Sequence, residues 1–245
     1  MEGMINKLLV EDVFSSIQGE GLGIGIPSIF VRFGGCNCSC AWCDTGYGSN
    51  LIPKSVEDFK KYTPQELYYQ VFNTTSFIKR VVITGGEPYV QDYKMLTEFI
   101  KLLYDKAYHI TVETNGTFLP PPEAPIDIYS ISPKLFSATG CETITEKQYE
   151  VIEYHIDKHP LSFYLKFVID TKSSKDINHL IRTLDNIIVR RGKIAFPIVL
   201  QPAFKKDKRD GGYNELYTLA RDYGLFMAYK TIRVLPQIHQ IARLK

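Results

Sequence analysis

Five cysteines occur in the chain, and four of them lie within eight residues, whereas Cys141 stands alone. The total is odd and four of the cysteines are too close together to close useful loops, so they do not make a disulfide framework. Within the group, Cys36, Cys40 and Cys43 form the pattern Cys-x3-Cys-x2-Cys, preceded by two glycines. Thiolates are soft ligands that suit iron–sulfur clusters and zinc alike. The residue types therefore predict a metal site and leave its metal open.

The spacing of these cysteines favours a cluster over zinc. A structural zinc site usually takes two separated cysteine pairs, and Cys141 has no cysteine or histidine at pair spacing. Three cysteines on one tight loop can instead hold three irons of a cubane and leave the fourth iron open to a small molecule. A zinc-binding interaction module stays as the alternative from a different class. Cys38 has no place in the pattern and is interpreted as a small, partly buried thiol.

Polar residues or turns follow nearly every strand that the sequence predicts. In a parallel βα barrel the carboxyl ends of the strands share one rim, where active sites are built. Each of these segments taken singly is equally well explained as an ordinary turn, but their recurrence favours a site on that rim. The segments are Thr84 to Glu87, Glu113 to Gly116, Ser132 to Lys134, Asp170, Gln201 and His239.

The elements that must position these residues alternate between strand and helix from about residue 29 onward, which predicts an α/β fold with a mostly parallel sheet. Predicted strands cover 29–33, 80–83, 110–112, 126–131, 163–168, 194–200 and 232–235. Predicted helices cover 63–72, 93–104, 146–155, 174–188 and 214–223, and the first opens with the capping box Thr63-Pro64-Gln65-Glu66. Seven strands are consistent with a partial (β/α) barrel, helices outside, plus an accessory strand.

Length and composition bound the remaining possibilities. A chain of 245 residues and 28.0 kDa, 44% hydrophobic and 23% charged, fits a single globular domain spanning 1–245. A formal charge of +2 is too balanced to predict a nucleic-acid partner, so a small-molecule ligand is favoured. No run approaches the roughly 18 apolar residues of a membrane span, and no signal-type apolar core opens the chain. The expected location is the cytoplasm.

Two motifs together resemble the radical S-adenosylmethionine superfamily. The three-cysteine loop follows the first predicted strand and has Trp42 just before its last cysteine, and Gly85-Gly86-Glu87-Pro88 follows the next strand. The resemblance implies a partial barrel of the radical S-adenosylmethionine type, one 4Fe–4S cluster on Cys36, Cys40 and Cys43, and bound S-adenosylmethionine. It also implies that the cofactor delivers the radical, so that no side chain is assigned a catalytic role. Implied cofactor contacts are Trp42, Cys43, Asp44, Gly86, Glu87, Ser132, Pro133, Lys134 and Gln201.

Ile17-Gln18-Gly19-Glu20-Gly21, ahead of the cluster loop, narrows the resemblance to the 7-carboxy-7-deazaguanine synthase family of queuosine and preQ0 biosynthesis, a carbon–nitrogen lyase family. Further matching pieces run the length of the chain: Phe30-Val31-Arg32, Cys43-Asp44-Thr45, Glu113-Thr114-Asn115-Gly116, Leu200-Gln201-Pro202 and Val234 to His239. The reaction implied is conversion of 6-carboxy-5,6,7,8-tetrahydropterin to 7-carboxy-7-deazaguanine, with ring contraction, loss of ammonia and regeneration of S-adenosylmethionine.

The resemblance also implies a substrate site. The N3–H and the exocyclic amine of the pterin edge match a carboxylate or backbone carbonyls, for which Gln18, Gly19 and Glu20 are the candidates. Arg32 suits the carboxylate of the substrate. The alternative for Arg32 is an ordinary surface ion pair. Thr45 is the expected Mg2+ ligand, since a hydroxyl oxygen suits that ion, with substrate and water supplying the other ligands. Implied substrate contacts are Ile17, Gln18, Gly19, Glu20, Arg32, Thr84, His239 and Lys245.

The partners implied are the pterin, a reductant such as flavodoxin or ferredoxin, and a second copy of the chain in a homodimer, with no membrane. The nearest rival is a glycyl-radical activase, whose cluster loop has the same spacing and whose substrate is a protein. Gln18 to Gly21 and Thr45 argue against that rival.

Overall fold

The sheet of this protein has a parallel body and an antiparallel edge. In the computed structural model, which describes residues 7–43, 56–204 and 210–244, nine strands form one sheet in the order β3-β1-β2-β4-β5-β6-β7-β8-β9. From β2 to β9 all neighbours pair in parallel, whereas β1 pairs antiparallel with both β2 and β3. The strands are β1 Leu8–Ile17, β2 Pro27–Phe33, β3 Lys60–Tyr62, β4 Arg80–Gly85, β5 His109–Thr114, β6 Ile128–Ile131, β7 Phe163–Ile169, β8 Ile198–Pro202 and β9 Ile232–Val234.

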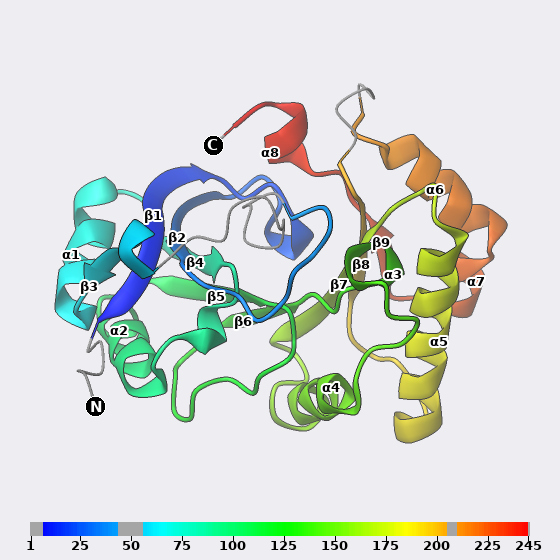
Figure 1. Ribbon diagram of the computed structural model, residues 1–245, viewed down its shortest axis with the longest axis horizontal. Helices are drawn as coiled ribbons and strands as arrows, with labels where there is room; N and C mark the ends of the chain where they lie inside the picture. The colour runs from blue at the N-terminus through cyan, green and yellow to red at the C-terminus, as the bar shows by residue number, and fades with distance from the viewer. Residues whose placement is uncertain (1–6, 44–55, 205–209, 245) are drawn as a thin grey trace.

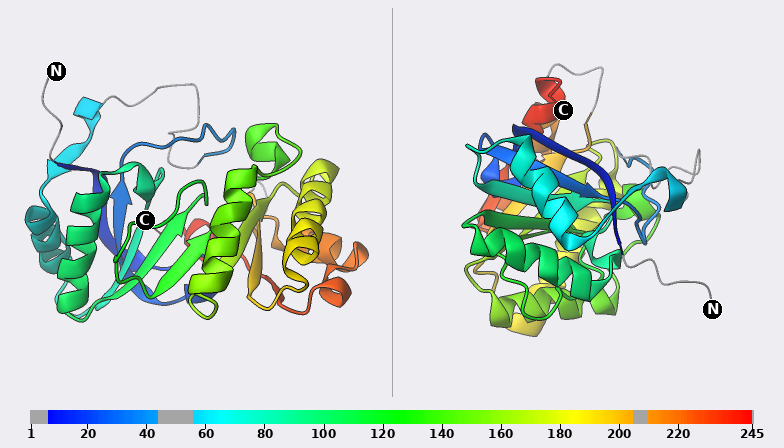
Figure 2. Two further views of the ribbon diagram at one scale, coloured as in Figure 1. Left: turned by 90° about the horizontal axis from the view of Figure 1, so that it is seen from below. Right: turned by 90° about the vertical axis from the view of Figure 1, so that its left-hand side faces the viewer.

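Helices connect the parallel strands and cover the outer face of the curved sheet (Figure 1, Figure 2). Capping explains where several begin: Thr63 and Thr145 each form a capping box, and the side chains of Asp92 and Ser173 accept from the backbone three residues on. The helices are α1 Pro64–Thr74, α2 Tyr93–Asp105, α3 Phe136–Thr139, α4 Glu146–Lys158, α5 Ser174–Arg191, α6 Tyr213–Asp222, α7 Leu225–Ala228 and α8 Ile238–Ile241, with 3-10 turns η1 Gly21–Gly23, η2 Val56–Asp58 and η3 Pro88–Val90.

The fold packs its apolar side chains between the sheet and these helices. Strand β7 shows how: Leu165, Phe167 and Ile169 join the buried core with residues of α4 and α5, while Lys166 and Val168 point to the inner face. A strand alternates its side chains between the two faces, so one buried strand can serve both a core and a site. The inner face is where the candidate site lies.

The sequence predictions of fold class and of every parallel strand are confirmed, with some bounds shifted. The predicted strand 194–200 begins at Ile198, because Pro197 has no N–H to give to a ladder. The expectation of one accessory strand is wrong, since two strands that the sequence does not predict, β1 and β3, join the edge of the parallel sheet. Strand β1 carries Glu11 and Asp12 and has an irregular register between Val10 and Asp12, which breaks the alternation that marks a strand.

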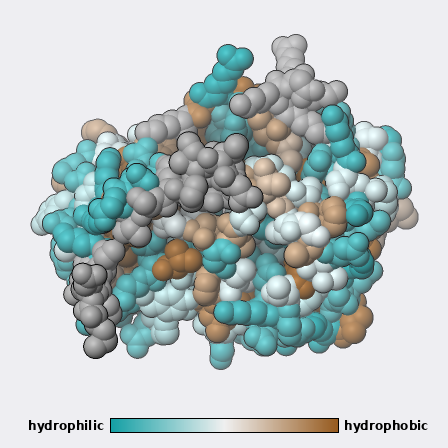
Figure 3. Space-filling view, in the orientation of Figure 1, coloured by the Kyte–Doolittle hydropathy of each residue, from teal (hydrophilic) through white to brown (hydrophobic). Residues whose placement is uncertain are grey.

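The outer surface visible in Figure 3 is mostly hydrophilic, with scattered apolar side chains. Among the described residues, no helix combines the length and apolar character that a membrane crossing requires.

Candidate active site

A cavity of about 620 Å3 opens on the inner face of the sheet. Its walls come from the ends of the parallel strands, the cluster loop after β2, the turn after β1, and α8. Most residues that the sequence predicted for the site line this one cavity: Ile17, Gln18, Gly19, Glu20, Arg32, Cys36, Cys40, Trp42, Cys43, Thr84, Gly86, Ser132, Lys134 and His239. Of the strand-end segments predicted for the rim, most contribute to this cavity, whereas Asp170 and Gln201 do not line it.

The cluster loop is held from outside by α3, and α5 in turn holds α3. Ala41 N donates to Ala138 O at 2.9 Å, and Trp42 Nε1 donates to Ser137 Oγ at 3.1 Å. Ser137 in turn donates to the buried carboxylate of Asp176 at 2.6 Å. These contacts fix the loop so that its thiols face the cavity.

Asn115 holds the loop from the side of β5. Its Nδ2 donates to Asn37 Oδ1 at 2.8 Å and lies 3.4 Å from the sulfur of Cys38. Cys38 also lines the cavity, and a hydrogen bond between Cys38 and Cys36 is the main cause that lowers the pKa of Cys36 to about 6. Burial raises the pKa of Cys40. Cys38 is thus one of the four cysteines that line the cavity and is not part of the apolar core.

The donor set fits a cubane cluster better than a single ion. Cys36, Cys40 and Cys43 all line the cavity, yet in the described ranges no three His, Cys, Asp or Glu side chains come together in a way that could hold one metal ion. A cubane needs no such convergence, because each thiolate binds a different iron. The structure therefore offers three soft ligands around a space, as a 4Fe–4S cluster with one open iron requires.

Gly85 and Gly86 allow the strand end of β4 to approach the cluster loop closely. A Cβ on Gly86 would lie 2.0 Å from the backbone oxygen of Gly35, and one on Gly85, whose φ is +137°, would lie 2.2 Å from Phe33 O. No side chain fits at such distances, since the neighbours are backbone atoms. The close packing of the two backbones thus requires glycine at both positions, and it places Gly86 in the cavity wall.

Glu87 lies differently from most of the other predicted cofactor contacts. Its side chain does not line the cavity but is fully buried, accepting from Tyr89 N at 3.1 Å, Thr114 Oγ1 at 2.8 Å and Asn115 N at 2.7 Å. Burial raises the pKa of Glu87 to about 7, although these hydrogen bonds act in the opposite direction. The carboxylate therefore joins the β4 and β5 ends, and its cofactor contact stays a prediction.

Two further predicted cofactor contacts stand away from the cavity. Gln201 is fully buried, and its Nε2 donates to Pro236 O at 3.0 Å. Pro133 is also buried, although its neighbours Ser132 and Lys134 line the cavity. Lys134 Nζ donates to Ser132 Oγ at 3.2 Å. Asp44, Thr45 and Lys245 lie outside the described residues.

The cavity wall contains a polar network that begins in the turn after β1. Gln18 Nε2 donates to Glu113 Oε1 at 3.0 Å, and Thr84 Oγ1 donates to Glu113 Oε2 at 3.1 Å. Glu20 N donates to Gln18 Oε1 at 3.0 Å. Gln18 and Thr84 come from distant parts of the chain and share one carboxylate.

Glu20 forms the second half of this network. Lys166 donates to its Oε2 and Gln237 Nε2 donates to its Oε1 at 2.5 Å, while His239 Nε2 lies 3.9 Å from the same Oε1. Burial alone would raise the pKa of Glu20, but the positive charge of Lys166, with a contribution from His239, outweighs it and lowers the pKa to about 2. The cavity therefore contains a fixed carboxylate anion.

An apolar wall stands beside these charges. The rings of Phe14 and Phe30 stack with centroids 5.3 Å apart, and the guanidinium of Arg32 lies 5.4 Å from the Phe14 centroid. A planar, partly apolar molecule with polar edges fits such a combination of flat rings and convergent charges.

The sequence places Glu113 to Gly116 on the rim but indicates no contact for the side chains of Glu113 and Asn115, and it assigns no site role to Lys166 or Gln237. A signal existed for Lys166, because it is a lone lysine within the seven-residue strand FYLKFVI, all of whose residues are buried. A buried lysine needs a partner, so an apolar strand with one lysine predicts a charge on the face opposite the core. Gln237 had no comparable signal.

Comparisons with known proteins agree with this geometry. A sequence profile of the radical SAM superfamily matches residues 30–168. A 7-carboxy-7-deazaguanine synthase from Aquifex aeolicus is 30% identical, over 97% of this chain and 94% of its own length, and one from Rickettsia prowazekii is 33% identical, over 96% and 91%.

Solved structures share the fold. QueE from Escherichia coli matches 94% of each chain with a TM-score of 0.65 at 22% identity. The AdoMet-bound enzyme anSMEcpe matches 83% of this chain and 61% of its own with a TM-score of 0.53 at 15% identity.

The fold and the cysteine loop thus define a radical S-adenosylmethionine enzyme, whose cofactors are a 4Fe–4S cluster and S-adenosylmethionine. Within that superfamily, the chain belongs to the 7-carboxy-7-deazaguanine synthase family.

Proposed function

We propose that this enzyme converts 6-carboxy-5,6,7,8-tetrahydropterin to 7-carboxy-7-deazaguanine, with loss of ammonia, in 7-deazapurine biosynthesis. The observation that carries the proposal is one cavity lined both by three thiols and by the Glu20 anion. When bound, the cluster and S-adenosylmethionine supply the one-electron chemistry that removes a hydrogen atom from the substrate. The relatives named for this activity support the assignment over nearly their full length.

The part of the cavity beside the thiols is assigned to the cofactors. Cys36, Cys40 and Cys43 hold three irons, and Gly86 with Ser132 and Lys134 borders the space beside them. The ammonium group of Lys134 suits a carboxylate, and a backbone carbonyl beside Gly86 suits an amine. An amino acid moiety bound between them would present both groups to the open iron.

The part of the cavity beside Glu20 is assigned to the pterin. Glu20 accepts from the N3–H and the exocyclic amine, and backbone groups of Gln18 and Gly19 add further contacts. Arg32 pairs with the substrate carboxylate, for which its planar fork gives two parallel hydrogen bonds. Phe14 and Phe30 exclude water beside the ring, which protects a reactive substrate radical from other hydrogen donors.

Several finer assignments belong to the same proposal. Thr45 supplies a hydroxyl to Mg2+, and Asp44 and Lys245 take the cofactor and substrate contacts that their family positions imply. His239 and Ile17 border the pterin, and the chain 1–245 acts as a single domain. The enzyme works in the cytoplasm as a homodimer, takes electrons from a flavodoxin or ferredoxin, and binds no nucleic acid.

The test is an anaerobic assay with dithionite, S-adenosylmethionine, Mg2+ and the tetrahydropterin, run on the reconstituted wild type and on Cys40→Ala. The wild type is expected to take up four irons and to form 7-carboxy-7-deazaguanine, and the variant is expected to do neither. Reconstituted wild type that cleaves S-adenosylmethionine but leaves the pterin unchanged would refute the substrate assignment. Omitting Mg2+ from the same assay tests the proposed role of Thr45.

A further inference from the structure

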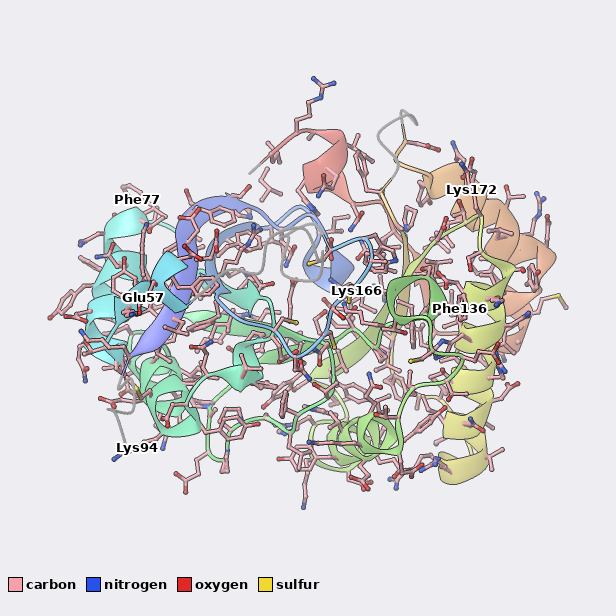
Figure 4. The ribbon with its side chains drawn as sticks, in the orientation of Figure 1. Glu57, Phe77, Lys94, Phe136, Lys166 and Lys172 are labelled. Carbon is pink, nitrogen blue, oxygen red and sulfur yellow. The ribbon has the colours of Figure 1, made fainter. Side chains whose placement is uncertain are left out.

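Lys166 is the most deeply buried cation of the cavity, and no role follows for it from the family motifs. It is 5% exposed and lies near the middle of the molecule (Figure 4). On β7, Lys166 pairs in register with Val199 of β8, and its sequence neighbours Leu165 and Phe167 are fully buried in the core. A charge inserted into such an apolar strand costs stability unless it is fully paired.

The partners of Lys166 all lie on the cavity side. It donates to Oε2 of Glu20, and Glu113 from β5 and Tyr164 from its own strand face it as well. Burial would lower the pKa of Lys166, but Glu20 and then Glu113 outweigh it and raise the pKa, so the side chain is a cation throughout the physiological range. Its charge is therefore directed at Glu20 and Glu113, which are both cavity residues.

The second oxygen of Glu20 is held independently. Gln237 donates to Oε1 at 2.5 Å, and His239 from α8 stands 3.9 Å away. With one donor on each oxygen, the carboxylate plane is fixed while each oxygen still has a lone pair to accept from another donor. Such an arrangement orients an acceptor before any ligand arrives, which reduces the ordering cost of binding.

We propose that Lys166 is a positioning residue that sets the ligand specificity of the cavity: it keeps Glu20 as an oriented anion, so that the site selects rings with two adjacent N–H donors. This inference rests on the proposed function. Carboxylate oxygens accept from the N3–H and 2-amino group of a pterin, but they repel the 2-oxo group of the corresponding lumazine. A merely structural ion pair would stabilise the fold without affecting this discrimination.

The experiment measures binding to the protein with its cluster reconstituted, without turnover. The probes are 6-carboxypterin and 6-carboxylumazine, titrated by their fluorescence into wild type and Lys166→Met, which has similar length and no charge. Lys158→Met, at an exposed position on α4, is the matched control. Wild type and control are expected to prefer the pterin. In Lys166→Met, pterin affinity is expected to fall by about ten- to a hundredfold, since Glu20 loses the cation that orients it and favours its ionised form.

Two further readouts separate a positioning role from a structural one. Without its cation, the buried Glu20 takes up a proton more readily, so pterin binding by Lys166→Met should weaken as the pH falls from about 7 to about 5 while that of the wild type stays level. A protonated Glu20 also donates to the 2-oxo group, so the preference for pterin over lumazine should shrink. The affinity for S-adenosylmethionine should stay unchanged, because its proposed site lies beside the thiols.

The outcomes are distinguishable. A Lys166→Met protein that binds and discriminates as the wild type does would overturn the role of Lys166, whereas a wild type that shows no preference for pterin would overturn the substrate assignment itself. If Lys166→Met fails to fold, the double variant Lys166→Met/Glu20→Gln removes both charges of the pair. That protein is expected to fold and to lose the preference, and retained preference would again overturn the inference.

Discussion

At the scale of single residues, the side chains of Glu87 and Lys166 both lie where the surrounding sequence does not indicate. Glu87 belongs to the Gly-Gly-Glu-Pro motif, yet its carboxylate joins two strand ends inside the protein. Lys166 belongs to no motif, yet it pairs with a cavity carboxylate. A short motif reports that residues occur together but not which way each side chain points, because the direction depends on strands that are far apart in the sequence.

Glu87→Gln tests whether that residue mainly joins the two strand ends or also contacts the cofactor. The amide has one acceptor oxygen instead of two, so the N–H of either Asn115 or Tyr89 would face an NH2 group. At pH 8, where Glu87 is mostly ionised, we expect the free energy of unfolding to fall by about 1.5–3 kcal/mol, measured by urea denaturation, because hydrogen bonds to a charged group are lost. The affinity of the folded variant for S-adenosylmethionine should stay near that of the wild type. Unchanged stability with a large loss of that affinity would confirm the cofactor contact.

His155→Phe tests a buried histidine far from the site. His155 on α4 is fully buried beside the rings of Tyr129 and Phe163, and burial, followed by the charge of His159, lowers its pKa to about 3. The unfolded chain binds this proton below about pH 6.5, whereas the folded protein does so only near pH 3. The stability that neutral His155 contributes is thus complete above pH 6.5 and is lost as the pH falls below it.

We expect wild-type stability in urea to decline from about pH 7 to pH 5, and the decline to be shallower in His155→Phe, where an aromatic ring remains but nothing titrates. His159 is retained in both proteins, so the difference between their pH profiles of stability reports on His155. Parallel pH profiles for the two would show that His155 does not contribute to acid sensitivity.

At the scale of elements, the cluster loop and the β4 end depend on each other. The close approach of Gly86 to Gly35 leaves no room for a side chain, and Asn115 fastens the loop from β5. The sequence predicted the strand, the glycines and the cysteines in order, because each has a local signal. It could not predict β3, since Lys60–Tyr62 is short and polar and becomes a strand only by pairing with β1.

Gly86→Ala tests that dependence. Its Cβ would meet Gly35 O at 2.0 Å and the Cβ of Cys36 at 2.9 Å, so the loop must shift away from β4. We expect the reconstituted variant to hold less than half the iron of the wild type, measured by iron and sulfide content and by the visible absorption of the cluster. Gly23→Ala is the control, because its Cβ would lie 3.4 Å from Gln18 Cγ, an ordinary contact. Equal iron content in Gly86→Ala would show that the loop tolerates the shift.

At the scale of the whole molecule, segments near the two ends of the described chain meet at the cavity. Ile238 N at the start of α8 donates to Gly19 O at 3.0 Å, and a Cβ on Gly19 would lie 2.1 Å from His239 Nδ1. The parallel strands and the strand-end site could be predicted from periodicity and turns. Periodicity could not predict the contact of α8 with the turn after β1, since a four-residue helix has no periodic signal. Only the family resemblance indicated that His239 and Gly19 share one site.

Deletion of residues 238–245 tests this closure. The sheet does not depend on α8, so we expect far-UV circular dichroism and iron content to be retained. The affinity for 6-carboxypterin should fall at least tenfold, measured by fluorescence titration, because His239 and the contact that orders Gly19 are lost together. Full-length protein prepared in parallel is the reference. A truncated protein that binds the pterin as tightly as the full-length chain would remove α8 from the site.

The hydrogen bond between Glu20 and Gln237 spans 217 residues of sequence. During synthesis on the ribosome, Glu20 therefore emerges long before its partner exists, and Lys166 appears in between. Contacts of such long range form late, since the intervening chain must first be ordered. A nascent chain could thus assemble its strands while its pterin pocket stays unfinished, and ligand binding would report completed folding later than any measure of secondary structure.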